Sequence, residues 1–116
     1  MPGGYLNQAR MSISTTGTGT FTLSAAIAGF NTFTTAGAVD QMVIPYSVID
    51  STANGSEKGW GVYSVAGPTL TRNVFISTNS NNAINCSSNA QVFIDPSVAD
   101  LVQLSLMAHA NLGGLL

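Results

Sequence analysis

The sequence predicts an all-β domain, a single β-sandwich of jelly-roll or Greek-key type. Short runs that alternate apolar and polar residues recur at intervals of about eight to twelve residues, which is typical of a sandwich or a small barrel. Clusters of Gly, Asn and Ser separate these runs, and Ser, Thr and Asn are spread along the whole chain. With 116 residues, the chain is long enough for one hydrophobic core. We therefore expect one domain with about eight short strands.

The first half of the chain contains three of the expected strands, at residues 10–14, 20–23 and 41–50. Residues 1–9 contain Pro and Gly and show no periodicity, so we expect an extended N-terminal arm there. Phe30 and Phe33 lie three residues apart before Gly37, a spacing that fits one helical turn packed under the sheet. Pro45 removes a backbone donor from the third strand, which predicts an edge strand or a bulge at that point.

The second half of the chain predicts five more strands, at residues 60–65, 69–71, 74–77, 83–86 and 91–94. Trp60 shares one face of its strand with Val62 and Ser64. Because a single Trp on an alternating strand is usually buried, we expect this face to point into the core. The body of the sandwich is expected to span residues 10–96.

Residues 97–116 form an apolar C-terminal extension. Ser97 and Asp100 have the spacing of a helix capping box, whereas Val102, Leu104 and Leu106 alternate as they would in a strand. We expect a short helical turn from Ser97, followed by an extended arm. An exposed arm of this composition is a liability in a monomer, so we expect it to dock on a neighbouring chain.

Charged residues make up only 7% of the chain, and the formal net charge is -2. Arg10, Lys58 and Arg72 are the only cations, too few to neutralise a run of phosphates, so we expect no nucleic-acid partner. A neutral surface opposes self-association only weakly, which favours a protein that packs against copies of itself or a partner. We also expect no membrane span, since no apolar stretch reaches the roughly 18 residues that a span needs. The N-terminus has no signal-peptide features, which predicts folding in the cytoplasm.

The residues offer little for catalysis, and we expect neither an enzyme nor a cofactor or metal site. His109 and Cys86 are each the only residue of their type, so a nucleophile–base pair would lack a third group to orient it. The single cysteine also excludes an internal disulfide. Asp40 and Asp50 bracket a strand without a calcium-binding loop, so we expect them to cap turns.

Arg72 is the candidate for a structural ion pair. It lies between two short strands, and a scarce Arg often forms a bidentate pair with a carboxylate. Asp40, Asp50 and Glu57 are the candidate partners. We also expect Glu57 and Lys58, just before Trp60, to form a solvent-exposed pair in a loop.

The order of short motifs resembles a module of structural proteins from tailed bacteriophages. Its first part is Gly17-Thr18-Gly19-Thr20-Phe21-Thr22-Leu23, followed by Ala28-Gly29-Phe30-Asn31-Thr32-Phe33 and Gly37. Its second part is Gly59-Trp60-Gly61-Val62-Tyr63, then Leu70-Thr71-Arg72-Asn73-Val74, Ser77-Thr78-Asn79 and Ile84-Asn85-Cys86-Ser87. The resemblance covers roughly residues 10–95. The chain departs from the pattern in having no acidic residue directly after Trp60, and in its apolar extension after Pro96.

This resemblance implies a non-enzymatic virion protein on the capsid exterior, made in the bacterial host cytoplasm. We expect a capsid decoration (cement) protein that bridges neighbouring major capsid protein subunits. A homo-oligomer is expected, with a trimer favoured because its symmetry matches three-fold junctions of the lattice. The two arms are the expected partner-binding elements, through Tyr5, Leu6, Leu101, Leu104, Leu106, Leu115 and Leu116.

Two alternatives remain open from the sequence. The first is an adaptor in the tail, neck or fibre of the particle. The second is a carbohydrate-binding β-sandwich, which would present an exposed aromatic platform near Tyr46, Trp60 or Tyr63.

Overall fold

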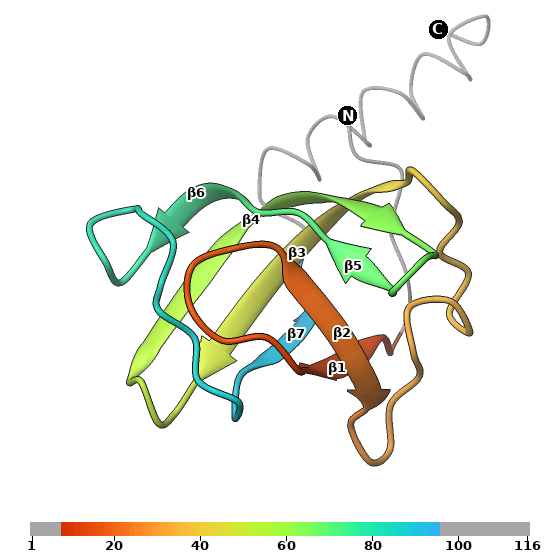
Figure 1. The fold of residues 1–116 in the computed structure, drawn as a ribbon, viewed down its shortest axis with the longest axis horizontal. Coiled ribbons are helices and arrows are strands. Elements are labelled where there is room, and N and C mark those ends of the chain that lie inside the picture. Colours follow the sequence, from red (N-terminus) through yellow and green to blue (C-terminus); the bar gives the residue numbers. More distant parts are fainter. Residues whose placement is uncertain (1–7, 96–116) are drawn as a thin grey trace, which may run out of the picture.

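The computed structural model describes residues 8–95, which form an all-β body (Figure 1). The described residues contain seven strands: β1 (Arg10–Ile13), β2 (Phe21–Ala26), β3 (Val43–Asp50), β4 (Gly55–Ser64), β5 (Thr69–Leu70), β6 (Asn73–Ser77) and β7 (Gln91–Ile94). The all-β prediction is confirmed. Nearly all of the predicted N-terminal arm and the whole of the C-terminal arm lie outside the described residues.

All seven strands are antiparallel to their neighbours and belong to one sheet. The strand order is β3-β7-β1-β2-β5-β4-β6, and β3 also pairs with β4. The pairings from β3 round to β4 therefore close into a ring, and β6 extends the sheet beyond β4 (Figure 1). The expected sandwich of about eight strands is not confirmed, because hydrogen bonding links every described strand into this single sheet.

The hydrophobic core fills the ring. On β3, Ile44, Tyr46 and Val48 alternate with outward residues and are fully buried. Other strands add Met11, Ile13, Phe21, Leu23, Leu70 and Val92. The Phe21 and Tyr46 rings meet edge to face with centroids 5.5 Å apart. Each large apolar side chain buried in this way contributes about 1.5–3 kcal/mol.

Two glycines in β4 allow the neighbouring strands to approach its inner face closely. A Cβ atom on Gly59 would lie 2.1 Å from the carbonyl oxygen of Asn73, and one on Gly61 would lie 2.2 Å from that of Thr71. The link between β5 and β6 therefore occupies the space that side chains would need. The register of β6 also shifts at this point, with Phe75 as the extra residue of a bulge.

Because Gly59 and Gly61 lie on the inner face of β4, Trp60 between them lies on the outer face. Tyr63 lies on the glycine side of β4 and is fully buried, whereas Trp60 on the opposite side is 43% exposed. The expectation that Trp60 belongs to the core is therefore wrong. The alternation was correct, but the glycines and Tyr63 form the inner face.

The predicted edge or bulge at Pro45 is also wrong, because β3 is paired on both sides. Pro45 opposes Trp60 of β4, and its carbonyl accepts a hydrogen bond of 3.1 Å from the N–H of Asp95, just after β7. In a regular ladder, the carbonyl of Asp95 would accept from residue 45 in return. Proline has no N–H, and the Nζ of Lys58 donates to that carbonyl instead. The strand thus tolerates proline where the β7 pairing ends.

Three smaller expectations change as well. The turn expected around Phe30 and Phe33 lies at residues 32–37, where the N–H of Ala36 donates to the carbonyl of Thr32, and it ends at Gly37 as expected, with a φ of 115°. Phe33 packs in the core, but Phe30 is exposed. The strand expected at residues 83–86 is reduced to one bridge between Cys86 and Gly17. Ala9, expected in the N-terminal arm, is buried and bridged to Asn31, so it belongs to the body.

Candidate functional site

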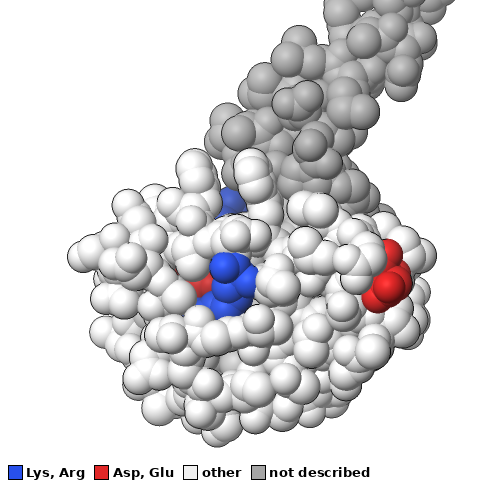
Figure 2. All heavy atoms as spheres, turned by 45° about the horizontal axis from the view of Figure 1, so that its top comes forward, with Lys and Arg blue, Asp and Glu red and all other residues white. Residues whose placement is uncertain are grey.

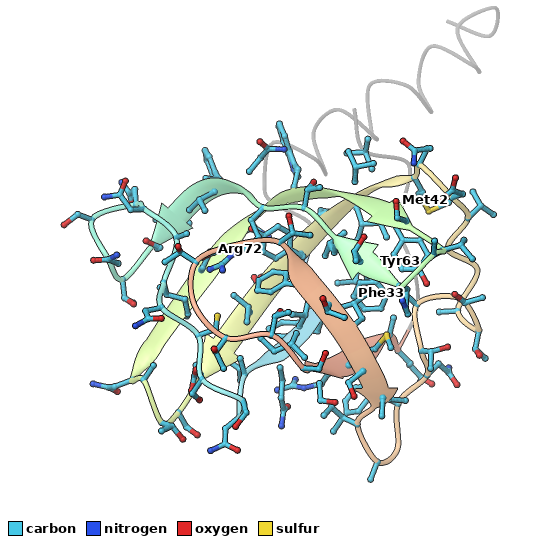
Figure 3. The ribbon with its side chains drawn as sticks, viewed as in Figure 1. Phe33, Met42, Tyr63 and Arg72 are labelled. Atoms are coloured by element: carbon cyan, nitrogen blue, oxygen red, sulfur yellow. The ribbon has the colours of Figure 1, made fainter. Side chains whose placement is uncertain are left out.

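Arg72 lies in the break between β5 and β6, and its side chain points into the ring (Figure 3). Its Nε and Nη2 atoms donate to the two carboxylate oxygens of Glu57 at 2.9 and 2.5 Å. The remaining donors reach the carbonyl oxygens of Gly17 and Gly19 at 3.1 Å and of Ile84 at 2.8 Å. The guanidinium also stacks over Phe21, 4.4 Å from the ring centroid. One side chain thus joins β4, the β1–β2 loop and the β6–β7 loop.

Glu57 is the partner of Arg72 among the three candidate carboxylates. It lies in β4 with a side chain 0% exposed, which corrects the expectation of a solvent-exposed Glu57–Lys58 loop pair. Glu57 also accepts a hydrogen bond of 2.6 Å from the Tyr46 hydroxyl and one of 2.9 Å from the N–H of Ile84. Each carboxylate oxygen of Glu57 therefore accepts two hydrogen bonds, and its charge is balanced by Arg72.

Burial and the network shift the pKa values of Tyr46, Arg72 and the neighbouring Cys86. Burial and the hydrogen bond to Glu57 raise the pKa of Tyr46 far above its usual value. Burial would lower the pKa of Arg72, but the hydrogen bond and the charge of Glu57, together with smaller contributions from Cys86 and Tyr46, outweigh burial and raise that pKa. Burial likewise raises the pKa of the Cys86 thiol, although the nearby Arg72 charge acts in the opposite direction. None of these groups is poised to exchange a proton near neutral pH.

Asp50 forms a second buried hub at the end of β3. Its Oδ1 accepts hydrogen bonds from the N–H groups of Thr52 and Ala53, both at 3.0 Å, and thereby caps the β3–β4 turn. Ser87, on the β6–β7 loop, donates to Asp50 from both its N–H and its hydroxyl. Burial would raise the pKa of Asp50, but these hydrogen bonds together lower it. Turn capping, the expected role of Asp50, is what the structure shows.

The other acidic residues of the described part also bind within the body. Asp40 accepts a hydrogen bond of 3.0 Å from the N–H of Val65. Asp95 accepts one of 2.5 Å from the Ser47 hydroxyl and lies 3.3 Å from the Lys58 ammonium. Within residues 8–95, no group of three or more His, Cys, Asp or Glu side chains could hold a metal ion. His109, the other half of the nucleophile–base pair considered above, lies outside the described residues.

The outward side of β7, β3, β4 and β6 is the candidate contact surface, termed here the outer face. The strand register aligns its residues in three rows across the sheet. The rows are Asp95, Pro45, Trp60 and Asn73; then Phe93, Ser47, Lys58 and Ile76; then Gln91, Ile49, Ser56 and Thr78. Every row therefore places at least one large apolar side chain on a surface that faces away from the core.

Large apolar side chains on and beside this face are solvent-exposed. Ile76 is 53% exposed, Phe75 at the β6 bulge is 65% exposed, and Ile49 is exposed as well. Isolated exposed side chains of this type are ordinary, but Trp60 on the intervening strand β4 is exposed as well. Three neighbouring strands thus each expose a large apolar side chain, which makes the outer face a candidate contact surface. Charge is sparse on the body, and Figure 2 shows small blue and red areas on a mostly white surface.

Arg10 borders the outer face next to Phe93. Its guanidinium lies 4.7 Å from the centroid of the Phe93 ring and 5.6 Å from that of Phe30. Its Nε donates to the side chain of Gln91 at 2.7 Å. These contacts cover apolar ring surface with a cation and limit the apolar area on this side.

The other sequence-predicted residues are placed as follows. Tyr46 and Tyr63 are 0% exposed, so of the aromatic platform proposed for a carbohydrate only Trp60 lies at the surface. The predicted partner-binding residues Tyr5, Leu6, Leu101, Leu104, Leu106, Leu115 and Leu116 lie outside the described residues. The outer face is not predicted from the sequence. Ile49 and Ile76 could have indicated it, since each is an apolar residue at an outward position of its strand.

Comparison of the chain with protein-family models, with curated proteins and with solved structures found no match. Among the residues that the structure describes, none form a helix with the length and apolar character needed to traverse a lipid bilayer.

Proposed function

We propose that this chain is a non-enzymatic structural protein of a tailed bacteriophage, a capsid decoration protein that bridges neighbouring major capsid subunits on the head exterior. The observation that carries the proposal is the outer face, which presents Ile49, Trp60 and Ile76 to solvent on a sheet that closes into a ring. Such a face is suited to burial against another protein. The motif order described above supplies the virion context.

The decoration mechanism is geometric. A rigid body lies over a junction of capsid subunits, and the outer face together with the two arms buries apolar surface on them. A specific contact requires roughly 1,000 Å² of buried area. Repetition over the lattice then converts a modest single contact into strong avidity. A trimer is the favoured assembly, because it places equivalent faces around a three-fold junction.

The state of the acidic residues supports a structural role over catalysis. General acid–base chemistry needs a titratable group directed at a substrate. Asp40, Asp50, Glu57 and Asp95 all accept hydrogen bonds from the body itself. Because these four carboxylates stabilise the fold, they favour a structural role for the protein.

Location on the particle tests the proposal. Purified phage particles that contain the protein are labelled with a gold-conjugated antibody against it, and we expect label over the whole head. Label confined to one ring at the neck or tail would instead identify the adaptor alternative. Particles without label would contradict a virion role altogether.

A binding assay tests the contact surface. Heads lacking the protein are mixed with the purified chain, and bound protein is measured after sedimentation. We expect Ile76→Ser to weaken binding at least several-fold, because it removes an exposed apolar side chain from the outer face. Val39→Ser, which also removes an exposed apolar side chain but lies on a different segment, is the matched control. Equal binding by both variants would show that the outer face is not the contact.

A further inference from the structure

The outer face contains a groove that lies where the described chain ends, at Asp95. The groove has a volume of about 410 Å³ and a mainly apolar lining. Its walls come from all four strands of the outer face: Phe93 from β7, Ser47 and Ile49 from β3, Lys58 from β4 and Ile76 from β6. We propose that residues 96–116 of the same chain dock in this groove, so that the apolar C-terminal segment covers the outer face in the free protein.

The chain leaves the described body at the rim of the groove. Asp95, the last described residue, is itself part of the groove lining. Three contacts hold it there. Its N–H donates to Pro45, its carboxylate accepts from Ser47, and its carbonyl accepts from Lys58. The described chain therefore ends beside the apolar side chains of the groove.

Pro45 contributes to this geometry. A residue with an N–H at position 45 would pair with the Asp95 carbonyl and continue the β3–β7 ladder. Because proline has no N–H, the ladder ends at the Asp95 carbonyl. That carbonyl accepts a hydrogen bond from Lys58 instead, whose side chain lies on the outer face. The end of β7 is thus tied to the outer side of the sheet.

The chemistry of the two surfaces is complementary. Residues 96–116 contain Leu101, Leu104 and Leu106, no Lys or Arg, and Asp100 as their only acid. The only cation in the groove lining, Lys58, already lies 3.3 Å from Asp95. An apolar, nearly neutral segment therefore meets an apolar lining whose charge is already balanced. The attachment at Asp95 also gives the segment a high effective concentration at its own groove, which favours it over a second copy.

This inference concerns the free protein and does not depend on which partner the outer face meets. It accounts for how a chain with an apolar face and an apolar segment can remain dispersed before assembly. An arm that covers its own body beforehand could be released onto a neighbour on the particle. The test below leaves the location of the protein on a virion untouched, so its failure and the failure of the proposed function are distinguishable.

Hydrogen–deuterium exchange of the full chain tests the docking. We compare the wild type with Ile49→Ser/Ile76→Ser, and use Val39→Ser/Val65→Ser as a matched control, since all four side chains are exposed and apolar. Docking predicts that peptides from residues 97–112 exchange at least tenfold faster in the groove variant than in the wild type or the control. Unfolding curves for all three proteins establish that the body remains folded.

A reciprocal variant keeps the test independent of the groove substitutions. Leu101→Ser/Leu104→Ser should speed exchange in peptides that cover β6, because a docked segment would cover Ile76 of that strand. Rates for residues 97–112 that are already those of an unprotected chain in the wild type would overturn the proposal. Protection that disappears on dilution, together with a dimer or trimer by light scattering, would also overturn it and would assign the groove to a second copy.

Discussion

At the scale of single residues, the Arg72 guanidinium supplies hydrogen-bond donors at the break between β5 and β6, where no strand pairing provides them. Three carbonyl oxygens from two loops converge on its guanidinium, together with the carboxylate of Glu57. The sequence indicated a structural role for Arg72 because cations are scarce. It did not identify Glu57 as the partner, because the choice among three carboxylates depends on strand pairings that are distant in sequence.

Replacing Arg72 should be far more damaging than replacing the other stacked arginine. Arg72→Met leaves the Glu57 carboxylate buried without its counter-charge, which we expect to lower the free energy of unfolding by about 3–5 kcal/mol. Arg10→Met loses partly exposed contacts with two rings and one hydrogen bond to Gln91, and should cost about 1 kcal/mol. Urea unfolding followed by Trp60 fluorescence measures both. Similar losses for the two variants would show that the Arg72 network is no more than a surface pair.

Asp50 should make stability depend on acid pH. Its pKa is lowered in the folded protein, so its contribution is fully present above the unfolded-state value and disappears as the pH falls through the lower, folded-state pKa. Asp50→Asn should therefore destabilise the body by about 1.5–3 kcal/mol at neutral pH, the usual value of hydrogen bonds to a charged group.

The difference between wild type and Asp50→Asn should shrink as the pH is lowered through this range. Unfolding free energies measured at several pH values for both proteins test this, and the comparison removes the contribution of the other carboxylates. A difference that stays constant with pH would mean that the Asp50 charge is unimportant and only its shape matters.

At the scale of elements, β4 shows what periodicity can and cannot predict. Alternation separated Trp60 and Val62 from Gly61 and Tyr63 without error, because side chains of a strand point to opposite faces in turn. It could not say which face is inside. Trp60 was assigned to the core by size, whereas the approach of the Thr71 carbonyl requires a residue without a side chain on the inner face.

This close approach predicts a large effect of a single methyl group. Gly61→Ala would place its Cβ 2.2 Å from the Thr71 carbonyl oxygen and 2.8 Å from the Leu70 side chain. Since backbone must move to relieve the contact, we expect a loss of about 1–3 kcal/mol or more. Gly19→Ala is the control, because nothing lies within 4 Å of its Cβ position. Thermal unfolding measures both, and equal midpoints would contradict the close approach.

At the scale of the whole molecule, the all-β class followed from local pattern, but closure of the ring did not. Strand β7 lies between β1 and β3, and it pairs Phe93 with Arg10 on one side and with Ser47 on the other. Neither pairing has a local signal, because the paired strands are far apart in the sequence. The outer face is a product of the same closure, since it exists only once β7, β3, β4 and β6 lie side by side.

The low charge of the whole chain leads to a prediction about how it associates. Charged contacts between proteins weaken as salt screens them, whereas apolar contacts do not, and excluded anions such as sulfate strengthen them. Charge makes up 7% of this chain, and Lys58 already lies near Asp95. If the chain is a capsid decoration protein as proposed, its binding to capsids should therefore change less than about twofold between 0.05 and 0.5 M NaCl, and should tighten in sulfate. Sedimentation of bound protein across a salt series measures it. A steep loss of binding with NaCl would assign the contact to Arg10 and Lys58, at the rim and the centre of the outer face, rather than to its apolar side chains.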